Sequence, residues 1–137
     1  MALLLLPLAS FAGEPTYVVT GETAPAYEIA AGKGEARLLH GPSTGSAAAA
    51  LELLRLAPGA AVPPHVHDGS TELLYIITGE VEMTVAGRVY RAGEDDAVHI
   101  PAGVEHSAKV VGSALEAVQV YVGPGPEQRF TTGKKLQ

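Results

Sequence analysis

Short apolar runs of strand length recur along the chain from residue 16 onward, and residues that favour turns separate them. Thr78-Gly79 and Ala86-Gly87, for example, bound the run at 81–85. Glycine and proline at this density would interrupt any helix of normal length, whereas short antiparallel strands tolerate them at their ends. The pattern therefore predicts an all-β fold, either a sandwich or a small barrel. The predicted strands include residues 17–19, 37–39, 49–57, 73–77, 81–85 and 115–122.

The segment SAAAALELLRLA, residues 46–57, fits two periodicities. Its alanine and leucine content favours a helix that would place Leu51, Leu54 and Arg55 on one face. Alternation instead places Leu51, Leu53 and Arg55 on one face of a strand that ends at a Pro-Gly turn. We predict the strand. If the face with Arg55 is interior, its guanidinium needs a carboxylate partner or an anionic ligand, and if it is exterior, Arg55 is an ordinary solvated charge.

Alternation along residues 72–78 predicts a strand that is apolar on both faces. Such a strand has to be covered on its outer side as well as on its inner side, either by a second sheet or by another subunit. The only charged residue, Glu72, begins an otherwise apolar face. The two predicted faces are Glu72, Leu74, Ile76 and Thr78 on one side, and Leu73, Tyr75 and Ile77 on the other.

Size, charge and cysteine content limit the function classes. A chain of 137 residues that is 47% hydrophobic and 18% charged is expected to form one domain around one core. The net charge of −6 and the absence of any basic cluster argue against nucleic acid and acidic membrane surfaces as partners. Because the chain has no cysteine, disulfides and thiolate sites are excluded. A metal would need nitrogen and oxygen ligands.

We divide the chain into an N-terminal segment, residues 1–15, and a single domain, residues 16–137. The leucine-rich start, followed by Ser10-Phe11-Ala12, is typical either of an apolar arm or of a remnant signal segment. No Lys or Arg precedes the leucines, and the stretch is too short to span a bilayer. We expect a cytoplasmic protein by default, and an exported or periplasmic one if residues 1–12 are a truncated signal peptide.

The stretch PPHVHDGSTE brings three metal-binding residue types together. In an extended segment His65 and His67 point the same way, and a turn at residues 68–70 separates them from Glu72. Two neutral imidazoles and a carboxylate suit first-row transition metals and leave exchangeable positions opposite. In IPAGVEH, a Pro-Gly turn starts a strand at His106, which is a fourth candidate. The alternatives are a closed, structural zinc site and a set of solvated surface groups.

The spacing of these residues resembles the two sequence motifs of the cupin family. Two departures are visible: seven residues rather than the usual five separate Gly93 from Pro101, and Val110 stands where the family often has asparagine. Neither affects a candidate ligand. The matching positions are Gly59, His65, His67, Glu72 and Gly79 in the first motif, and Pro101, Gly103 and His106 in the second.

The resemblance implies a cupin-type jelly-roll β-barrel, an antiparallel double-stranded β-helix of six to eight strands, with its motif core at residues 59–106. It also implies one divalent transition metal per chain, Fe, Mn, Ni, Zn, Cu or Co. The implied ligands are His65, His67, Glu72 and His106. Because cupins commonly pair through apolar sheet faces, a homodimer is expected.

An open site of three histidines and one glutamate predicts a dioxygenase-like metalloenzyme that acts on a small organic molecule. The alternative is a non-redox cupin that binds a sugar or a carboxylate ligand, either as an isomerase or epimerase or as a binding module. The remaining polar candidates have no spacing that assigns a role, and we expect most to be structural, with His99 facing outward. They are Tyr75, Gln119, Tyr121, Arg55, His40 and His99.

Overall fold

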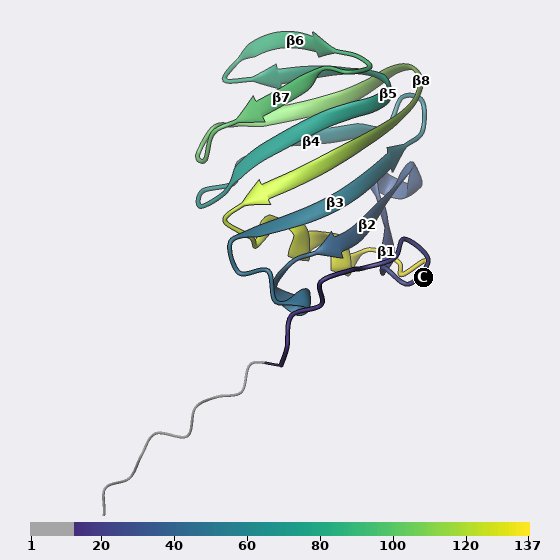
Figure 1. Ribbon diagram of the computed structural model, residues 1–137. Coiled ribbons are helices and arrows are strands. Elements are labelled where there is room, and N and C mark those ends of the chain that lie inside the picture. Colours follow the sequence, from purple (N-terminus) through teal and green to yellow (C-terminus); the bar gives the residue numbers. More distant parts are fainter. Residues whose placement is uncertain (1–12) are drawn as a thin grey trace, which may run out of the picture.

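The computed structural model describes residues 13–137, so most of the predicted N-terminal arm, residues 1–12, lies outside the described residues (Figure 1). Within the described part of the chain, no helix is long and apolar enough to cross a membrane. The elements are the strands β1 (Ala26–Ile29), β2 (Gly34–His40), β3 (Ala49–Leu56), β4 (Ala61–His65), β5 (Thr71–Val85), β6 (Arg88–Ala92), β7 (Ala97–Ile100) and β8 (His106–Val122), and the 3-10 helices η1 (Ala30–Gly32), η2 (Pro42–Thr44) and η3 (Pro126–Thr132).

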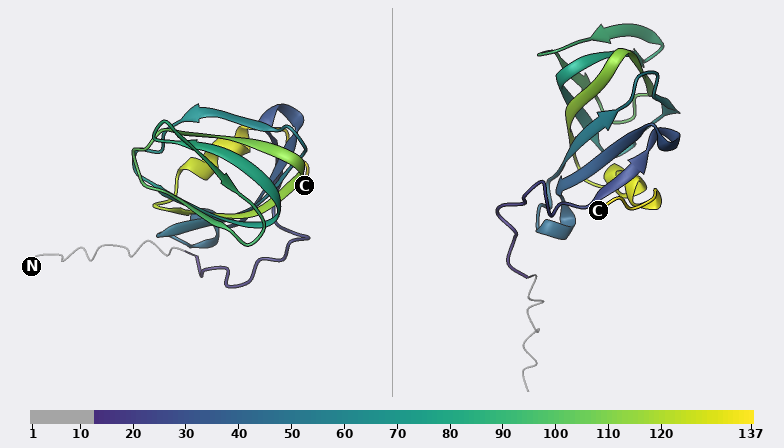
Figure 2. Two further views of the ribbon diagram at one scale, coloured as in Figure 1. Left: turned by 90° about the horizontal axis from the view of Figure 1, so that it is seen from above. Right: turned by 90° about the vertical axis from the view of Figure 1, so that its right-hand side faces the viewer.

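The barrel can be described as two sheets, and two long strands, β5 and β8, each contribute one half to each sheet. The second half of β8 pairs with β3 and with the first half of β5, whereas the first half of β8 pairs with β4 and with the second half of β5. β1, β2 and β7 extend the first sheet, and β6 extends the second. All pairings are antiparallel, and the strands enclose a barrel when viewed from above (Figure 2). The predicted jelly-roll fold is confirmed.

A bulge in β5 corrects the prediction of two separate strands on either side of Thr78-Gly79. The strand is continuous, but its register with β8 shifts on both sides of Thr78. Gly79 has a φ of 86°, and a Cβ there would lie 2.3 Å from the carbonyl oxygen of Ala114. The bulge also changes which side chains face inward: Ile76 and Val81 are buried, whereas Thr78 is exposed rather than on the inner face.

The segment of ambiguous periodicity forms β3, as predicted. Its partners β2 and β8 supply backbone hydrogen bonds on both edges, which overrides the helical propensity of its alanines and leucines. Arg55 lies on the outer face, where its Nε is 2.8 Å from Glu116 Oε2. The solvated-charge interpretation of Arg55 is therefore correct, and the residues that alternate with it, including Glu52, face the interior.

The strand predicted at residues 17–19 does not form. Tyr17 and Val18 are 80% and 79% exposed, and the segment has no strand beside it. One backbone hydrogen bond, from Thr16 N to Thr44 O, attaches the preceding residue to the domain. The short apolar run lacks the cross-strand partners that stabilise a sheet, so its β propensity alone is insufficient.

The outer face of β5 keeps two large apolar side chains in contact with solvent. Leu73 is 40% exposed and Tyr75 is 45% exposed, although the Tyr75 hydroxyl donates a hydrogen bond to Asp95. No second sheet of this chain covers them in residues 13–137. Coverage by a second subunit stays a prediction.

The C-terminal segment after β8 packs back against the barrel (Figures 1 and 2). Glu127 and Phe130 of η3 are buried, and Lys135 forms a bridge with Tyr27 of β1. The end of β1 and the C-terminal segment therefore line one side of the interior.

Candidate metal site

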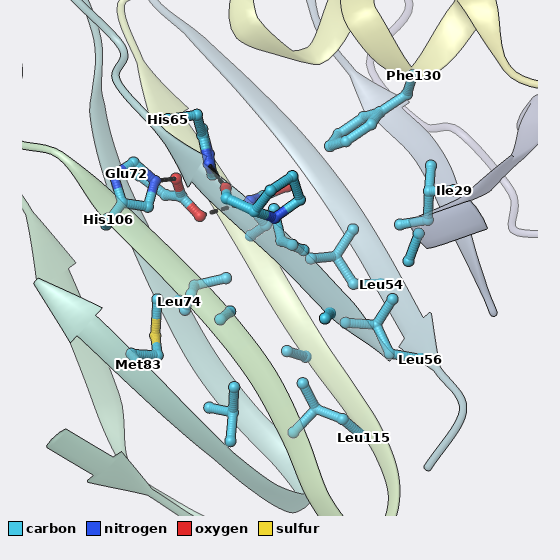
Figure 3. A pocket seen from close by; sticks show the side chains of 18 of the residues that line it. Ile29, Leu54, Leu56, His65, Glu72, Leu74, Met83, His106, Leu115 and Phe130 are labelled. Carbon is cyan, nitrogen blue, oxygen red and sulfur yellow. Dashed lines mark hydrogen bonds and ion pairs between the residues drawn. The ribbon is translucent and has the colours of Figure 1, made fainter. Parts of the chain in front are cut away.

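Three histidines and one glutamate converge at one end of the barrel interior. His65 ends β4 and is the register partner of His106, the first residue of β8. Glu72 is the second residue of β5, and His67 lies in the connection from β4 to β5. One potential ligand atom from each residue lies within 4.8 Å of all the others. The structure therefore brings together all four residues that the sequence singled out. Figure 3 shows three of them, His65, Glu72 and His106.

Local backbone features explain why these side chains meet. β4 is an edge strand whose register with β8 shifts between Val62 and His65, so its two prolines remove no ladder hydrogen bond from a central strand. Gly103, with a φ of 79°, donates its backbone N–H to the carbonyl oxygen of His67 at 2.9 Å. That bond ties the connection holding His67 to the turn that leads into His106.

Backbone carbonyl groups fix the tautomers of two imidazoles. His65 Nδ1 lies 2.8 Å from the carbonyl oxygen of Pro63, and His106 Nδ1 lies 2.9 Å from that of Val104. A carbonyl oxygen only accepts hydrogen bonds, so each Nδ1 carries the proton. In the neutral ring this leaves the Nε2 lone pair of both histidines directed toward the cluster.

Glu72 receives contacts at both of its carboxylate oxygens. Gln119 Nε2 donates a hydrogen bond to Oε1 at 2.6 Å, while Oε2 lies 3.1 Å from His106 Nε2 and 3.2 Å from His67 Nε2. Burial would raise the pKa of Glu72, but the contacts with His106, His67 and Gln119 outweigh it and lower that pKa to about 2. Burial would likewise lower the pKa of His106, but the contact with Glu72 raises it. Glu72 is therefore a carboxylate at neutral pH.

The donor set fits a first-row divalent metal ion. The Nε2 atom of His65 is buried and makes no hydrogen bond, and that of His67 is buried 3.2 Å from Glu72 Oε2. A buried imidazole lone pair beside a carboxylate is unfavourable unless a cation lies between them. Ligand bonds of about 2.1 Å place neighbouring donor atoms about 3.0 to 3.4 Å apart in octahedral to tetrahedral sites, and His106 Nε2 and His67 Nε2 lie 3.1 and 3.2 Å from Glu72 Oε2. The four residues could hold such an ion, with His65 only partly buried beside the interior cavity.

A cavity of about 390 Å³ extends from this cluster into the barrel (Figure 3). Its walls come from both sheets and from the terminal segments, and they are mostly apolar. Burial behind aliphatic side chains excludes water and strengthens electrostatic interactions at the polar end. The aliphatic and aromatic lining includes Ile29, Leu54, Leu56, Leu74, Ile76, Val81, Met83, Leu115 and Phe130.

Sequence reasoning missed three residues near this cavity. Glu52 is fully buried, with both carboxyl oxygens unpartnered, and Arg129 and Glu28 line the cavity. Glu52 shares a strand face with Leu54 and Leu56, and that alternation was a usable signal for an interior acid. Arg129 follows a Gly-Pro-rich segment, and no local pattern in the sequence indicates that it folds back to the barrel.

The other polar candidates divide between the interior and the surface. Gln119 contacts Glu72, and Tyr121 is fully buried with its ring 5.1 Å from that of His67. His40, the last residue of β2, contacts Thr44 of η2, and His99 is exposed on β7, as predicted. Tyr75 and Arg55, described above, are on outer faces, so four of the six candidates lie away from the cluster.

Comparison with known proteins identifies the family. A family model described as a cupin domain matches residues 52–123. This segment includes the whole cluster and more than half of the 137-residue chain. The chain belongs to the cupin family. Within the family, this cupin is 26% identical over 92 residues to the polyketide synthase CurC of Streptomyces cyaneus, a match that covers 66% of this chain and 60% of CurC.

Solved cupin structures confirm the fold. The polyketide cyclase RemF from Streptomyces resistomycificus is similar with a TM-score of 0.69 and 21% identity, over 81% of this chain and 82% of RemF. An oxalate decarboxylase from Bacillus subtilis is similar with a TM-score of 0.70 and 25% identity, over 86% of this chain and 33% of the decarboxylase. This cupin thus spans about three fifths of CurC and one third of the decarboxylase.

Proposed function

We propose that this cupin binds one divalent transition metal ion through His65, His67, Glu72 and His106, and that it acts as a dioxygenase-like enzyme on a small, mainly apolar organic molecule. The observation that carries this proposal is the apolar cavity that begins at the four-residue cluster. When bound, the ion would supply Lewis-acid activation of a substrate oxygen and a redox partner for dioxygen.

The residues of the chain have separate roles in this proposal. The backbone carbonyls at Pro63 and Val104 hold His65 and His106 in the tautomer that presents Nε2. Gln119 holds Oε1 of Glu72 and so directs Oε2 toward the imidazoles. The aliphatic walls orient the substrate body and keep bulk water from the reacting oxygen.

The lining of the cavity disfavours the sugar alternative. A sugar presents hydroxyl groups around its ring, and each one needs a polar partner when it is buried. Outside the cluster, Gln119 directs its amide nitrogen to Glu72, and most lining side chains are aliphatic. An apolar substrate with one or two oxygens near the cluster fits these walls better.

A non-redox reaction on the same substrate class is the second candidate. It is favoured by the names of two similar proteins, the polyketide synthase CurC and the polyketide cyclase RemF. In such a reaction the cluster would polarise a carbonyl group without consuming dioxygen. The two candidates share a cavity and differ in their need for oxygen.

Oxygen consumption separates the two candidates. The protein is purified without a metal-affinity column, its metal content is measured, and it is then loaded anaerobically with Fe(II) and offered apolar enols and catechols. Near-stoichiometric metal with substrate-dependent oxygen uptake supports the dioxygenase. Product formation without oxygen uptake supports the non-redox reaction, and a protein that binds no transition metal contradicts both.

We also propose that a second copy of the chain covers Leu73 and Tyr75 on the outer face of β5. Together these partly exposed side chains leave an apolar strip on a strand whose inner face is already packed. Light scattering of wild type and Leu73→Asp tests the proposal. A dimer that becomes a monomer in the variant supports it, and a monomeric wild type contradicts it.

A further inference from the structure

Arg129 gives the cavity a positive charge from outside the matched cupin domain. It belongs to η3, whereas the family model ends at residue 123. Its Nη2 donates a hydrogen bond to the Tyr121 hydroxyl at 3.2 Å, and its Cζ lies 5.3 Å from the centre of the Phe130 ring. Both aromatic residues are buried. Although Arg129 is an exposed residue, these two contacts place its guanidinium at the cavity wall.

No carboxylate of the described residues neutralises this guanidinium. The arginines that form ion pairs within residues 13–137 are Arg37, Arg55 and Arg91. Glu127, on the same short helix, uses one oxygen to accept from Gly125 N at 2.6 Å and the other to accept from Gln128 Nε2 at 3.1 Å. Arg129 thus keeps donors that suit a planar carboxylate.

The same cavity connects Arg129 with the candidate metal ligands. His65, Glu72 and His106 line it together with Arg129. Tyr121 provides a second connection, because its hydroxyl contacts Arg129 while its ring packs edge-on against His67 at 5.1 Å. A molecule in the cavity can therefore contact the guanidinium and still reach the cluster.

The charge around the cavity limits the number of anionic groups. Outside the four-residue cluster, the charged residues that line the cavity are Arg129 and Glu28. Glu28 comes from β1 and would repel a second anionic group. The aliphatic walls between them favour hydrocarbon.

We propose that Arg129 is a specificity-determining residue that binds the carboxylate of an apolar monocarboxylic acid. The substrate carries a further oxygen group at its other end, and that oxygen lies near the four-residue cluster. This inference rests on the proposed function for the place of the reaction, but the carboxylate contact itself does not require the metal. The four-residue cluster of the cupin domain is then the place of the reaction, and Arg129 of the C-terminal segment selects the substrate.

Calorimetric titration of the full chain tests the contact. The probes are phenylacetate, 4-phenylbutyrate and hexanoate, each compared with its uncharged primary amide, in metal-free and in cobalt-loaded protein. We expect metal-free wild type to bind the acids about 10- to 100-fold more tightly than the amides, as for a charge-assisted pair. Arg129→Gln should remove that preference, and Arg129→Lys should restore part of it.

Arg91→Gln, which removes an exposed cation paired with Glu80 and Glu82, is the matched control and should keep the preference. Equal acid binding by wild type and Arg129→Gln overturns the inference, as does an acid preference seen only after cobalt loading. Neither result would contradict the proposed metal site. Conversely, an Arg129-dependent preference in a protein that takes up no cobalt supports the inference and contradicts the proposed metalloenzyme.

Discussion

Glu52 on β3 and Gln119 on β8 are register partners inside the barrel, and both leave side-chain oxygens without a hydrogen-bond partner. Gln119 directs its amide nitrogen to Glu72, so its Oε1 is available to accept a hydrogen bond from a group on β3. Burial, followed by the negative charges of Glu127 and Glu72, raises the pKa of Glu52 to about 8. Glu52 is therefore mainly a neutral acid at pH 7.

The pKa of Glu52 predicts how stability depends on pH. The folded state holds a proton that the unfolded chain loses above pH 4.5, so the free energy of unfolding should fall as pH rises from about 4.5 to about 8 and then level off. The slope from this group approaches about 1.4 kcal/mol per pH unit within that window. Glu52→Gln should remove the slope and be more stable than wild type at pH 8.

Urea unfolding of metal-free wild type and Glu52→Gln between pH 5 and pH 9 checks this prediction. Glu105→Gln, an exposed substitution of the same chemistry, is the control and should follow the wild-type curve. Parallel curves for wild type and Glu52→Gln would mean that Glu52 is ionised in the folded state.

Removal of any one clustered imidazole should lower metal occupancy. We expect His65→Ala, His67→Ala and His106→Ala each to bind divalent metal at least about tenfold more weakly, because each removes a nitrogen that converges on Glu72 or lies within the cluster. His40→Ala and His99→Ala should leave occupancy unchanged. Elemental analysis of the five purified variants makes the comparison, and equal metal content in all of them would contradict the ligand assignment.

The hydrogen bond from Gln119 to Glu72 should support metal affinity without contributing a ligand. Gln119→Leu leaves Glu72 Oε1 without its 2.6 Å partner and should weaken metal binding about 10- to 100-fold. Glu116→Gln, on the outer face of the same strand, is the matched control. Competition with a coloured chelator measures both, and a wild-type affinity in Gln119→Leu would show that Glu72 is oriented by its other contacts.

The β5 bulge should tolerate only glycine at position 79. Gly79 and Gly87 both have positive φ, so an alanine at either position costs about 1–2 kcal/mol in backbone strain. At Gly79 the added Cβ would also lie 2.3 Å from the Ala114 carbonyl oxygen, whereas at Gly87 it meets open space. Thermal unfolding should therefore show a much larger loss for Gly79→Ala than for Gly87→Ala, and equal losses would contradict the predicted clash.

The candidate site was predictable because its information is local. His65 and His67 share a strand face through their spacing of two, and Glu72 and His106 each follow a turn that starts a strand. The resemblance to cupin motifs depended on the same short intervals. The strand at residues 49–56 was also predictable, since the alternation of apolar side chains indicates which face is buried.

The tertiary structure alone decided the surroundings of the site. Gln119 reaches Glu72 across 47 residues of sequence, and Arg129 reaches the cavity through a segment with no periodic pattern. The continuity of β5 through Gly79 and the exposure of Thr78 depend on register with β8. The residue pattern of one strand does not determine that register. Side-chain alternation fixes the face of a residue within its own strand, whereas the partner opposite that face is set by how distant strands pair and how the chain ends fold back.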